Sequence, residues 1–237
     1  MKFKLPRSVE FYVFGAFVLI ESIIYIIIQI YDFAFNENLI YVKYAGILTC
    51  LAFAAAGIYF YGKDGILITV ALVFTAISDL FILIMIEFVA GISTFIVVQL
   101  IHFVRIYLIN GKKPWISLGV RLGVVAVGFA LFGGLGMLNS PIVVLSCIYF
   151  PQLIINTVES GLLIKIDKSY ILLFVGLVLF TFCDIFVGLY NAGTLGLNMP
   201  ANLLDLARKF IWTVYLPAQV LIVLSEKKTE YKPFFKK

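Results

Sequence analysis

Apolar residues occupy this chain in long continuous runs, and short polar stretches separate one run from the next. Each run is roughly twenty residues long, which is the length that an α-helix needs to cross about 30 Å of hydrocarbon. The pattern predicts eight membrane-spanning helices, near residues 9–31, 42–61, 65–87, 89–109, 115–135, 141–164, 169–190 and 203–225. No stretch between the runs is long enough for a soluble domain, so residues 1–237 are predicted to form a single membrane domain.

Composition supports this all-α, polytopic helix bundle. Hydrophobic residues make up 63% of the chain and charged residues 13%, and the mean hydropathy is +1.10. Backbone groups in lipid must be satisfied within helices. The chain is therefore predicted to be a multi-pass integral membrane protein in contact with membrane lipid, located in the cytoplasmic membrane if its source is bacterial. The sequence leaves its oligomeric state open.

Lysine and arginine indicate how the helices are oriented. With eight crossings most of them fall on one side, which the positive-inside rule makes cytoplasmic. They are Lys2, Lys4, Arg7, Lys63, Lys112, Lys113, Lys165, Lys168, Lys227, Lys228, Lys232, Lys236 and Lys237. A minority, Lys43, Arg208 and Lys209, fall on the opposite side. Both termini are therefore expected in the cytoplasm, and the net charge of +5 is a topology signal that gives no indication of nucleic-acid binding.

Two aspartates lie deep within apolar runs, Asp79 in TAISDLFILIM and Asp184 in FTFCDIFVGLY. Placing an acidic side chain in hydrocarbon costs free energy, so acids at such positions usually have a function. Their matching contexts, four helices apart, indicate a weak parallel repeat, and each acid lies about 21 to 22 Å from the cytoplasmic end of its helix. Similar depth allows the two carboxyls to meet and share a proton. In the alternative interpretation, each aspartate separately binds a backbone carbonyl, a Ser or a Tyr on a neighbouring helix.

Other polar residues within the runs are sorted by depth. Glu21 lies at a level similar to that of the aspartates, whereas His102, Arg105, Arg121, Asn156, Glu159 and Gln219 fall nearer the cytoplasmic side. Arg121 and Glu159 are candidates for an ion pair, and Arg105 and Arg121 could instead extend to the lipid headgroups. One His and three dispersed cysteines, Cys50, Cys147 and Cys183, do not supply the ligands of a catalytic zinc site.

Several of these segments resemble the YhhN-like lysoplasmalogenase family. Ser78-Asp79-Leu80-Phe81, followed by Phe88, Gly91, Phe95 and His102, is similar to the family signature S/G-D-x-x-L…G-x-x-x-F…H. The segment GLVLFTFCD, which ends at Asp184, resembles a second G-x-x-x-F-x-x-S-D segment. The run from Tyr215 through Gln219 to Ser225 resembles the closing Y-x-x-x-Q-x-L-I-x-x-S helix. The chain departs from the pattern at Tyr44, Arg105 and Cys183, where the family often has Pro, Tyr and Ser.

The resemblance implies an enzyme that cleaves the vinyl-ether bond of lysoplasmalogens to a fatty aldehyde and a glycerophospho-headgroup, without a metal or cofactor. It implies Asp79 and Asp184 as catalytic carboxyls. Lys43, His102, Tyr215 and Gln219 are the candidates for binding the lysophospholipid headgroup or orienting the acids, and Glu21 is added to them because of its depth. A vinyl ether is opened by protonation of its alkene carbon, which suits one acid and one base.

Two other functions remain open. Parallel repeats with paired intramembrane acids also occur in proton-coupled transporters, and Pro151-Gln152 is a weak likeness to PQ-loop carriers. The departures at Tyr44 and Arg105 are compatible with a non-catalytic lipid-binding membrane protein. Release of aldehyde by the purified protein in detergent would distinguish the enzyme from both.

Overall fold

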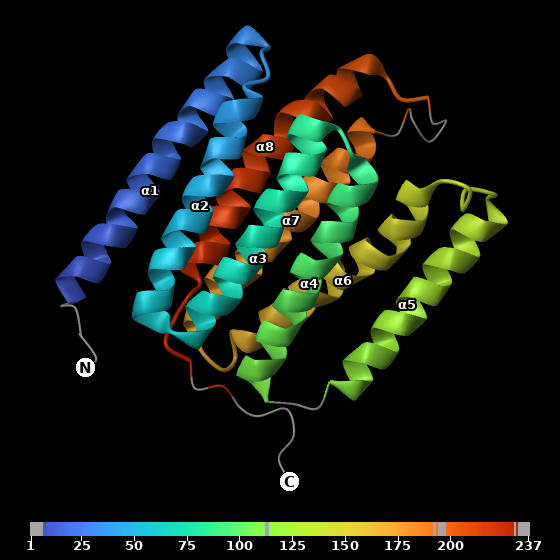
Figure 1. Cartoon of the computed structure of the whole chain (residues 1–237). Coiled ribbons are helices and arrows are strands. Elements are labelled where there is room, and N and C mark those ends of the chain that lie inside the picture. The colour runs from blue at the N-terminus through green and yellow to red at the C-terminus, as the bar shows by residue number, and fades with distance from the viewer. Residues whose placement is uncertain (1–6, 112–113, 192, 194–197, 230, 232–237) are drawn as a thin grey trace.

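A computed structural model describes residues 7–111, 114–191, 193, 198–229 and 231 of the chain (Figure 1). Within them lie eight helices long and apolar enough to cross a membrane, as predicted. They are α1 (Arg7–Ile30), α2 (Ile40–Tyr61), α3 (Lys63–Asp79), α4 (Phe88–Asn110), α5 (Trp115–Gly134), α6 (Pro141–Leu163), α7 (Ile171–Tyr190) and α8 (Ala201–Leu224). Short turns of π-helix, η1 (Tyr31–Phe35) and η2 (Leu80–Met85), extend α1 and α3, and a 3₁₀ turn, η3 (Lys168–Tyr170), precedes α7.

The first helix extends further than its polar end suggests. Asp32 reads as part of a break in the sequence, but the helix continues through it as η1 and ends at Asn36 with a positive φ of 55°. Asp32 is 1% exposed because it pairs with Lys43 of α2. Because the Lys43 ammonium compensates the Asp32 carboxylate, the helix can continue through this buried acid.

Six of the helices form a closed ring. Going around it, α2 packs on α3, α3 on α4, α4 on α6, α6 on α7, α7 on α8, and α8 on α2. The remaining two lie outside the ring at opposite edges of the bundle, α1 against α2 and α8, and α5 against α6 (Figure 1). Most neighbour relations recur four helices later, as between α2–α3 and α6–α7, which agrees with the weak parallel repeat.

The directions of α1 and α8 distinguish the two ends of the bundle. The start of α1 and the end of α8 lie at the same end of the molecule, which we call the terminal end (Figure 1). The positive-inside rule predicts that this end is cytoplasmic. Of the basic residues counted for that prediction, Lys2, Lys4, Lys112, Lys113, Lys232, Lys236 and Lys237 lie outside the described residues.

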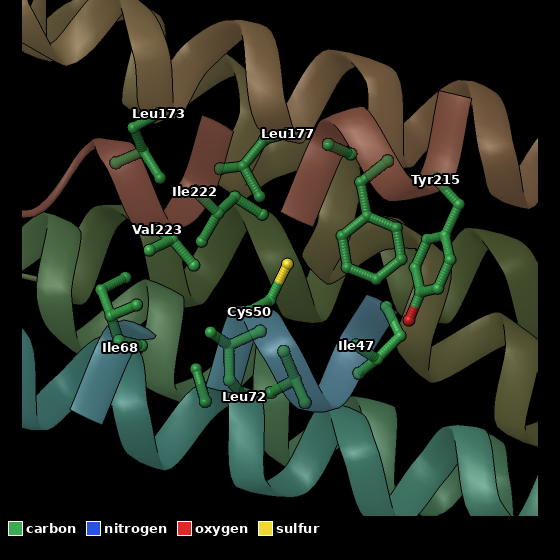
Figure 2. Close-up of a cluster of buried hydrophobic side chains, with 14 of the residues drawn as sticks. Ile47, Cys50, Ile68, Leu72, Leu173, Leu177, Tyr215, Ile222 and Val223 are labelled. Atoms are coloured by element: carbon green, nitrogen blue, oxygen red, sulfur yellow. The ribbon is translucent and has the colours of Figure 1, made fainter. Parts of the chain in front are cut away.

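The interior of the ring is apolar toward the terminal end. Side chains from α2, α3, α7 and α8 meet there, and Figure 2 shows Cys50, Leu72, Leu177 and Ile222 pointing toward one another. Tyr215 lies at one edge of this cluster (Figure 2).

Candidate active site

Asp79 is the last residue of α3 and lies where the α-helix changes to the π-helix η2. It is 4% exposed, and the Tyr215 hydroxyl of α8 donates a hydrogen bond of 2.7 Å to its Oδ2. Interruptions of this kind are frequent at functional sites. The η2 turn ends at Ile86 with a φ of 60°, which is strained for a β-branched residue. Asp79 is thus fixed between a distorted helix end and a tyrosine.

Asp184 has a matching arrangement on α7. The Tyr149 hydroxyl of α6 donates a hydrogen bond of 2.5 Å to its Oδ2. Tyr149 is 7% exposed and Asp184 is half-buried. Both predicted catalytic acids therefore bind a tyrosine from another helix, much as in the alternative interpretation of the sequence.

The two tyrosines share a local sequence. Each stands two residues before a proline inside its helix, Tyr149 before Pro151 and Tyr215 before Pro217. Proline has no backbone N–H, so it leaves the carbonyl four residues earlier without its helical partner. For Pro217 that carbonyl belongs to Thr213, and the Tyr25 hydroxyl lies 3.4 Å from it as donor.

An aromatic stack connects the two pairs. The ring of Phe95 lies 6.0 Å from that of Tyr149 and 5.6 Å from that of Phe180, and Phe180 lies 5.6 Å from Tyr215, measured between centroids. Asp184 is close enough to Asp79 to interact with it electrostatically. No direct hydrogen bond joins the two carboxyls in the part of the chain that is described. The two acids thus lie near enough for their charges to interact, and each is hydrogen-bonded to its own tyrosine.

The second oxygen of each acid, Oδ1, accepts no hydrogen bond from any described residue. Two clefts open along α1, and neither is lined by Asp79 or Asp184. The acids therefore do not open onto either of these clefts.

Lys43 lies on α2 and is 2% exposed. Its Nζ donates to Asp32 Oδ1 and to Asn38 Oδ1, both at 2.8 Å, and lies 5.5 Å from the Trp212 ring. Trp212 in turn packs edge-on against Tyr215 at 5.2 Å. The predicted headgroup lysine is thus neutralised by an acid and reaches Asp79 only through two aromatic rings.

His102 and Gln219 are buried toward the terminal end, 2% and 1% exposed. His102 Nδ1 and Gln219 Nε2 have no hydrogen-bond partner among the described residues. Gln99 Nε2, one turn beyond Phe95 on α4, makes no hydrogen bond of good geometry to them but lies beside Tyr149. Unsatisfied buried polar groups are uncommon and require an explanation. Among the described residues, His102 and Gln219 therefore carry the unpartnered polar atoms nearest in sequence to the aromatic stack.

Neither arginine extends to the lipid headgroups. Arg105 is fully buried and binds Asp64 through two hydrogen bonds of 2.7 and 2.9 Å. The predicted pair of Arg121 and Glu159 is present at 2.6 Å, and Arg121 also donates to Gln152 of the Pro-Gln dipeptide at 2.8 Å. The headgroup interpretation is wrong for both, because each finds a carboxylate inside the protein.

Glu21 lies on α1, outside the ring, and the structure does not bring it to the aspartates. Its Oε1 accepts from the Cys50 thiol of α2 at 3.6 Å, and its Oε2 has no described partner. Similar depth therefore does not place it in the same site.

Sequence reasoning missed Tyr149. The available signal was the second Tyr-x-Pro within a predicted span, which matches the one at Tyr215.

No group of three or more His, Cys, Asp or Glu side chains among the described residues is arranged to hold a metal ion.

The fold and these buried acids define a polytopic membrane protein with a carboxyl–tyrosine site inside its helix ring. Residues 38–226 match the model of the YhhN family, so the chain belongs to that family, which is the lysoplasmalogenase family. At family level this membership fits a lysoplasmalogenase-type hydrolase. Comparison with curated proteins and with solved structures finds no match.

Proposed function

We propose that this protein is an intramembrane hydrolase that cleaves the vinyl-ether bond of lysoplasmalogens, with Asp79 and Asp184 as its acid and base. The observation that carries the proposal is the pair of aspartates inside the ring, each held by one tyrosine at Oδ2. Each keeps Oδ1 available for proton transfer. Membership of the YhhN family supports the reaction class.

The reaction requires two proton-transfer groups and water. A protonated carboxyl gives its hydrogen to the alkene carbon that does not carry oxygen, which leaves an oxocarbenium ion. Water adds to the oxygen-bearing carbon and loses a proton to the second carboxylate. The resulting hemiacetal collapses to a fatty aldehyde and the glycerol hydroxyl of the headgroup product. The step consumes one water and needs no oxidant or reductant.

The surroundings of the two acids suggest how the roles are divided. Asp79 is only 4% exposed, which suits a group that holds a proton away from water. Asp184 is half-buried and better placed to accept a proton from water. Tyr215 and Tyr149 orient the acids, because a fixed Oδ2 leaves Oδ1 in a defined position.

In this proposal, buried side chains that lack hydrogen-bond partners bind the polar part of the substrate. His102 and Gln219 each offer a buried side-chain nitrogen without a partner among the described residues, and a lipid hydroxyl or phosphate oxygen would satisfy them. Neither cleft along α1 is lined by the aspartates, so the proposed substrate enters past the half-buried Asp184 or by displacement of a helix. The segment of α8 around Pro217 is suited to such a displacement, since proline removes a helical hydrogen bond there.

The test is aldehyde release from a lysoplasmalogen by the purified protein in detergent. Asp79→Asn and Asp184→Asn are each expected to lower kcat by roughly 10²- to 10⁴-fold, the usual contribution of general acid–base catalysis. Asp205→Asn is the matched control, because Asp205 lies at the start of α8 and pairs only with Arg208 and Lys209. Full hydrolysis by a normally folded Asp79→Asn variant would refute the proposal. Activity that appears only as solute flux into sealed vesicles would identify a transporter instead.

A further inference from the structure

A cleft of about 420 Å³ lies between α1 and α8, on the outside of the helix ring. Its walls are one face of each helix: Val18, Glu21, Ser22, Tyr25 and Ile26 from α1, and Leu216, Pro217, Val220 and Leu221 from α8. The α1 residues recur at intervals of three and four, as expected for a single helix face. Because α1 is an outer helix, the cleft opens sideways, toward the lipid.

Glu21 supplies a hydrogen-bonding group to this apolar cleft. The residue is 2% exposed and its Oε2 has no partner among the described residues. Thr49 lies nearby, but its hydroxyl hydrogen is used in a bond of 2.7 Å to the Ala45 carbonyl. The other side chain beside the carboxyl is the weak donor Cys50, whose thiol lies 3.6 Å from Oε1. Buried polar groups usually have hydrogen-bond partners, so a buried carboxyl with few of them is a candidate for binding a ligand.

The depth of Glu21 selects the kind of ligand. It lies thirteen residues beyond Ser8, where the span begins, which is about 20 Å along the helix and well inside the hydrocarbon. A charged headgroup at this depth would cost several kcal/mol of desolvation, whereas a neutral oxygen costs far less. The apolar walls suit a hydrocarbon chain, and a protonated carboxyl can donate a hydrogen bond to a terminal carbonyl oxygen.

The cleft is separated from the aspartates by a single helix. Leu216 faces the cleft, and the residue before it, Tyr215, binds Asp79 on the other side of α8. Pro217 lines the cleft at the same level. A molecule released beside Asp79 would therefore have to pass only this part of α8 to reach the cleft.

We propose that the α1–α8 cleft is a lateral binding site for a long-chain fatty aldehyde, with the protonated carboxyl of Glu21 donating a hydrogen bond to the aldehyde oxygen. The identity of the ligand as the reaction product rests on the proposed function. The cleft gives the aldehyde a path into the bilayer that avoids water.

The experiment uses the full chain in lipid nanodiscs and a sixteen-carbon aldehyde that carries a diazirine in its chain. After irradiation, labelled residues are mapped by mass spectrometry, and no reductant is added, so that lysine imines are not trapped. Labelling is expected to concentrate on α1 and α8 residues of the cleft. Glu21→Leu should lower it at least fivefold, whereas Glu21→Gln should retain most of it, because an amide still donates to a carbonyl.

Two further variants make the result interpretable. Glu10→Leu is the matched control, since Glu10 lines the other cleft along α1 and should leave labelling of the α1–α8 cleft unchanged. Val220→Trp fills the cleft without altering Glu21 and should also abolish labelling, so the test does not depend on one variant folding. Labelling spread evenly over lipid-facing helices, or unaffected by both Glu21→Leu and Val220→Trp, would overturn the inference.

The outcome is separable from that of the proposed function. Asp79→Asn should keep full labelling while losing hydrolysis. If the wild-type protein hydrolyses no lysoplasmalogen yet shows Glu21-dependent labelling, the cleft stands as an aldehyde site and the proposed reaction is wrong. If the protein hydrolyses lysoplasmalogen but labelling does not depend on the cleft, the proposed reaction stands and the aldehyde site is wrong.

Discussion

Arg105 of α4 and Asp64 of α3 form a two-point ion pair in which both side chains are fully buried. The same guanidinium donates to the Ser225 hydroxyl at 2.9 Å and to its carbonyl at 2.8 Å. Asp64 also accepts from the Lys227 backbone at 2.9 Å and from the Tyr231 hydroxyl at 2.6 Å. This pair fastens the segment after α8 to the terminal end of α3 and α4.

Arg105→Met is expected to lower the free energy of unfolding by about 3–5 kcal/mol, because it leaves the Asp64 carboxylate buried without its cation. Thermal unfolding of the detergent-solubilised protein measures the loss. Arg208→Met is the control: its pair with Asp205 is partly exposed, so the loss there should be about 0–1 kcal/mol. Adding Asp64→Leu to Arg105→Met should recover part of the stability. An Arg105→Met variant as stable as the wild type would show that the pair contributes nothing.

Tyr149→Phe and Tyr215→Phe should each lower kcat for aldehyde release by about tenfold, equivalent to the loss of one hydrogen bond at roughly 1.4 kcal/mol. Each keeps the ring in the aromatic stack and removes only the hydroxyl that fixes an aspartate. Steady-state kinetics should show the change in kcat, with KM little altered.

Tyr107→Phe is the matched control for both tyrosine variants. It removes a hydroxyl that also donates to a carboxylate, Glu159, at 2.9 Å, but on the α4–α6 contact away from the aspartates. Its kcat should equal that of the wild type. Equal losses in all three variants would mean that the tyrosines act only on stability.

Gly65→Ala should destabilise the protein by about 1–3 kcal/mol, the usual cost of overpacking. A Cβ at this position would lie 2.6 Å from the carbonyl carbon of Gly57 and from the nitrogen of Ile58, and backbone atoms cannot move aside as a side chain can. Gly15→Ala should instead raise stability by about 0.5–1 kcal/mol, since nothing lies within 4 Å and alanine favours helix. Thermal unfolding of both variants measures the contrast, and a harmless Gly65→Ala would show that α2 and α3 do not approach this closely.

Glu226 predicts a pH dependence of stability. Burial, together with the nearby Asp64 charge and despite Arg105, raises the pKa of its carboxyl from 4.5 to about 9. Between these values the folded protein holds a proton that the unfolded chain releases, so this residue makes stability fall as pH rises from about 5 to 9. Glu226→Gln should flatten that part of the profile in thermal unfolding, whereas Glu87→Gln, at an exposed position, should not. An unchanged slope in Glu226→Gln would refute the assignment.

The helices were predictable because hydrophobic length alone determines where this chain can cross a bilayer. Asp79 and Asp184 stood out for the same reason, since an acid within an apolar run needs an explanation. Their similar depth predicted a common neighbourhood but not the hydrogen bonds. Those depend on which helices adjoin, and sequence order does not state that α8 lies beside α2 or that α6 follows α4 around the ring.

The ionic partners were the least predictable part. Lys43 was expected at a headgroup, and Arg105 was open to the same interpretation, yet Asp32 and Asp64 neutralise them inside the protein. Both acids lie near predicted helix ends, where sequence patterns favour exposure to water. Tyr149 was missed because a tyrosine in a span is ordinary, and only its contact with Asp184 distinguishes it from the other tyrosines.

The two Asp–Tyr contacts involve four different helices: α3 with α8, and α7 with α6. The gap between the acids is therefore set by how one pair of helices sits against the other. A shift of α6 and α7 relative to α3 and α8 would change this gap while each tyrosine stays bound to its own aspartate.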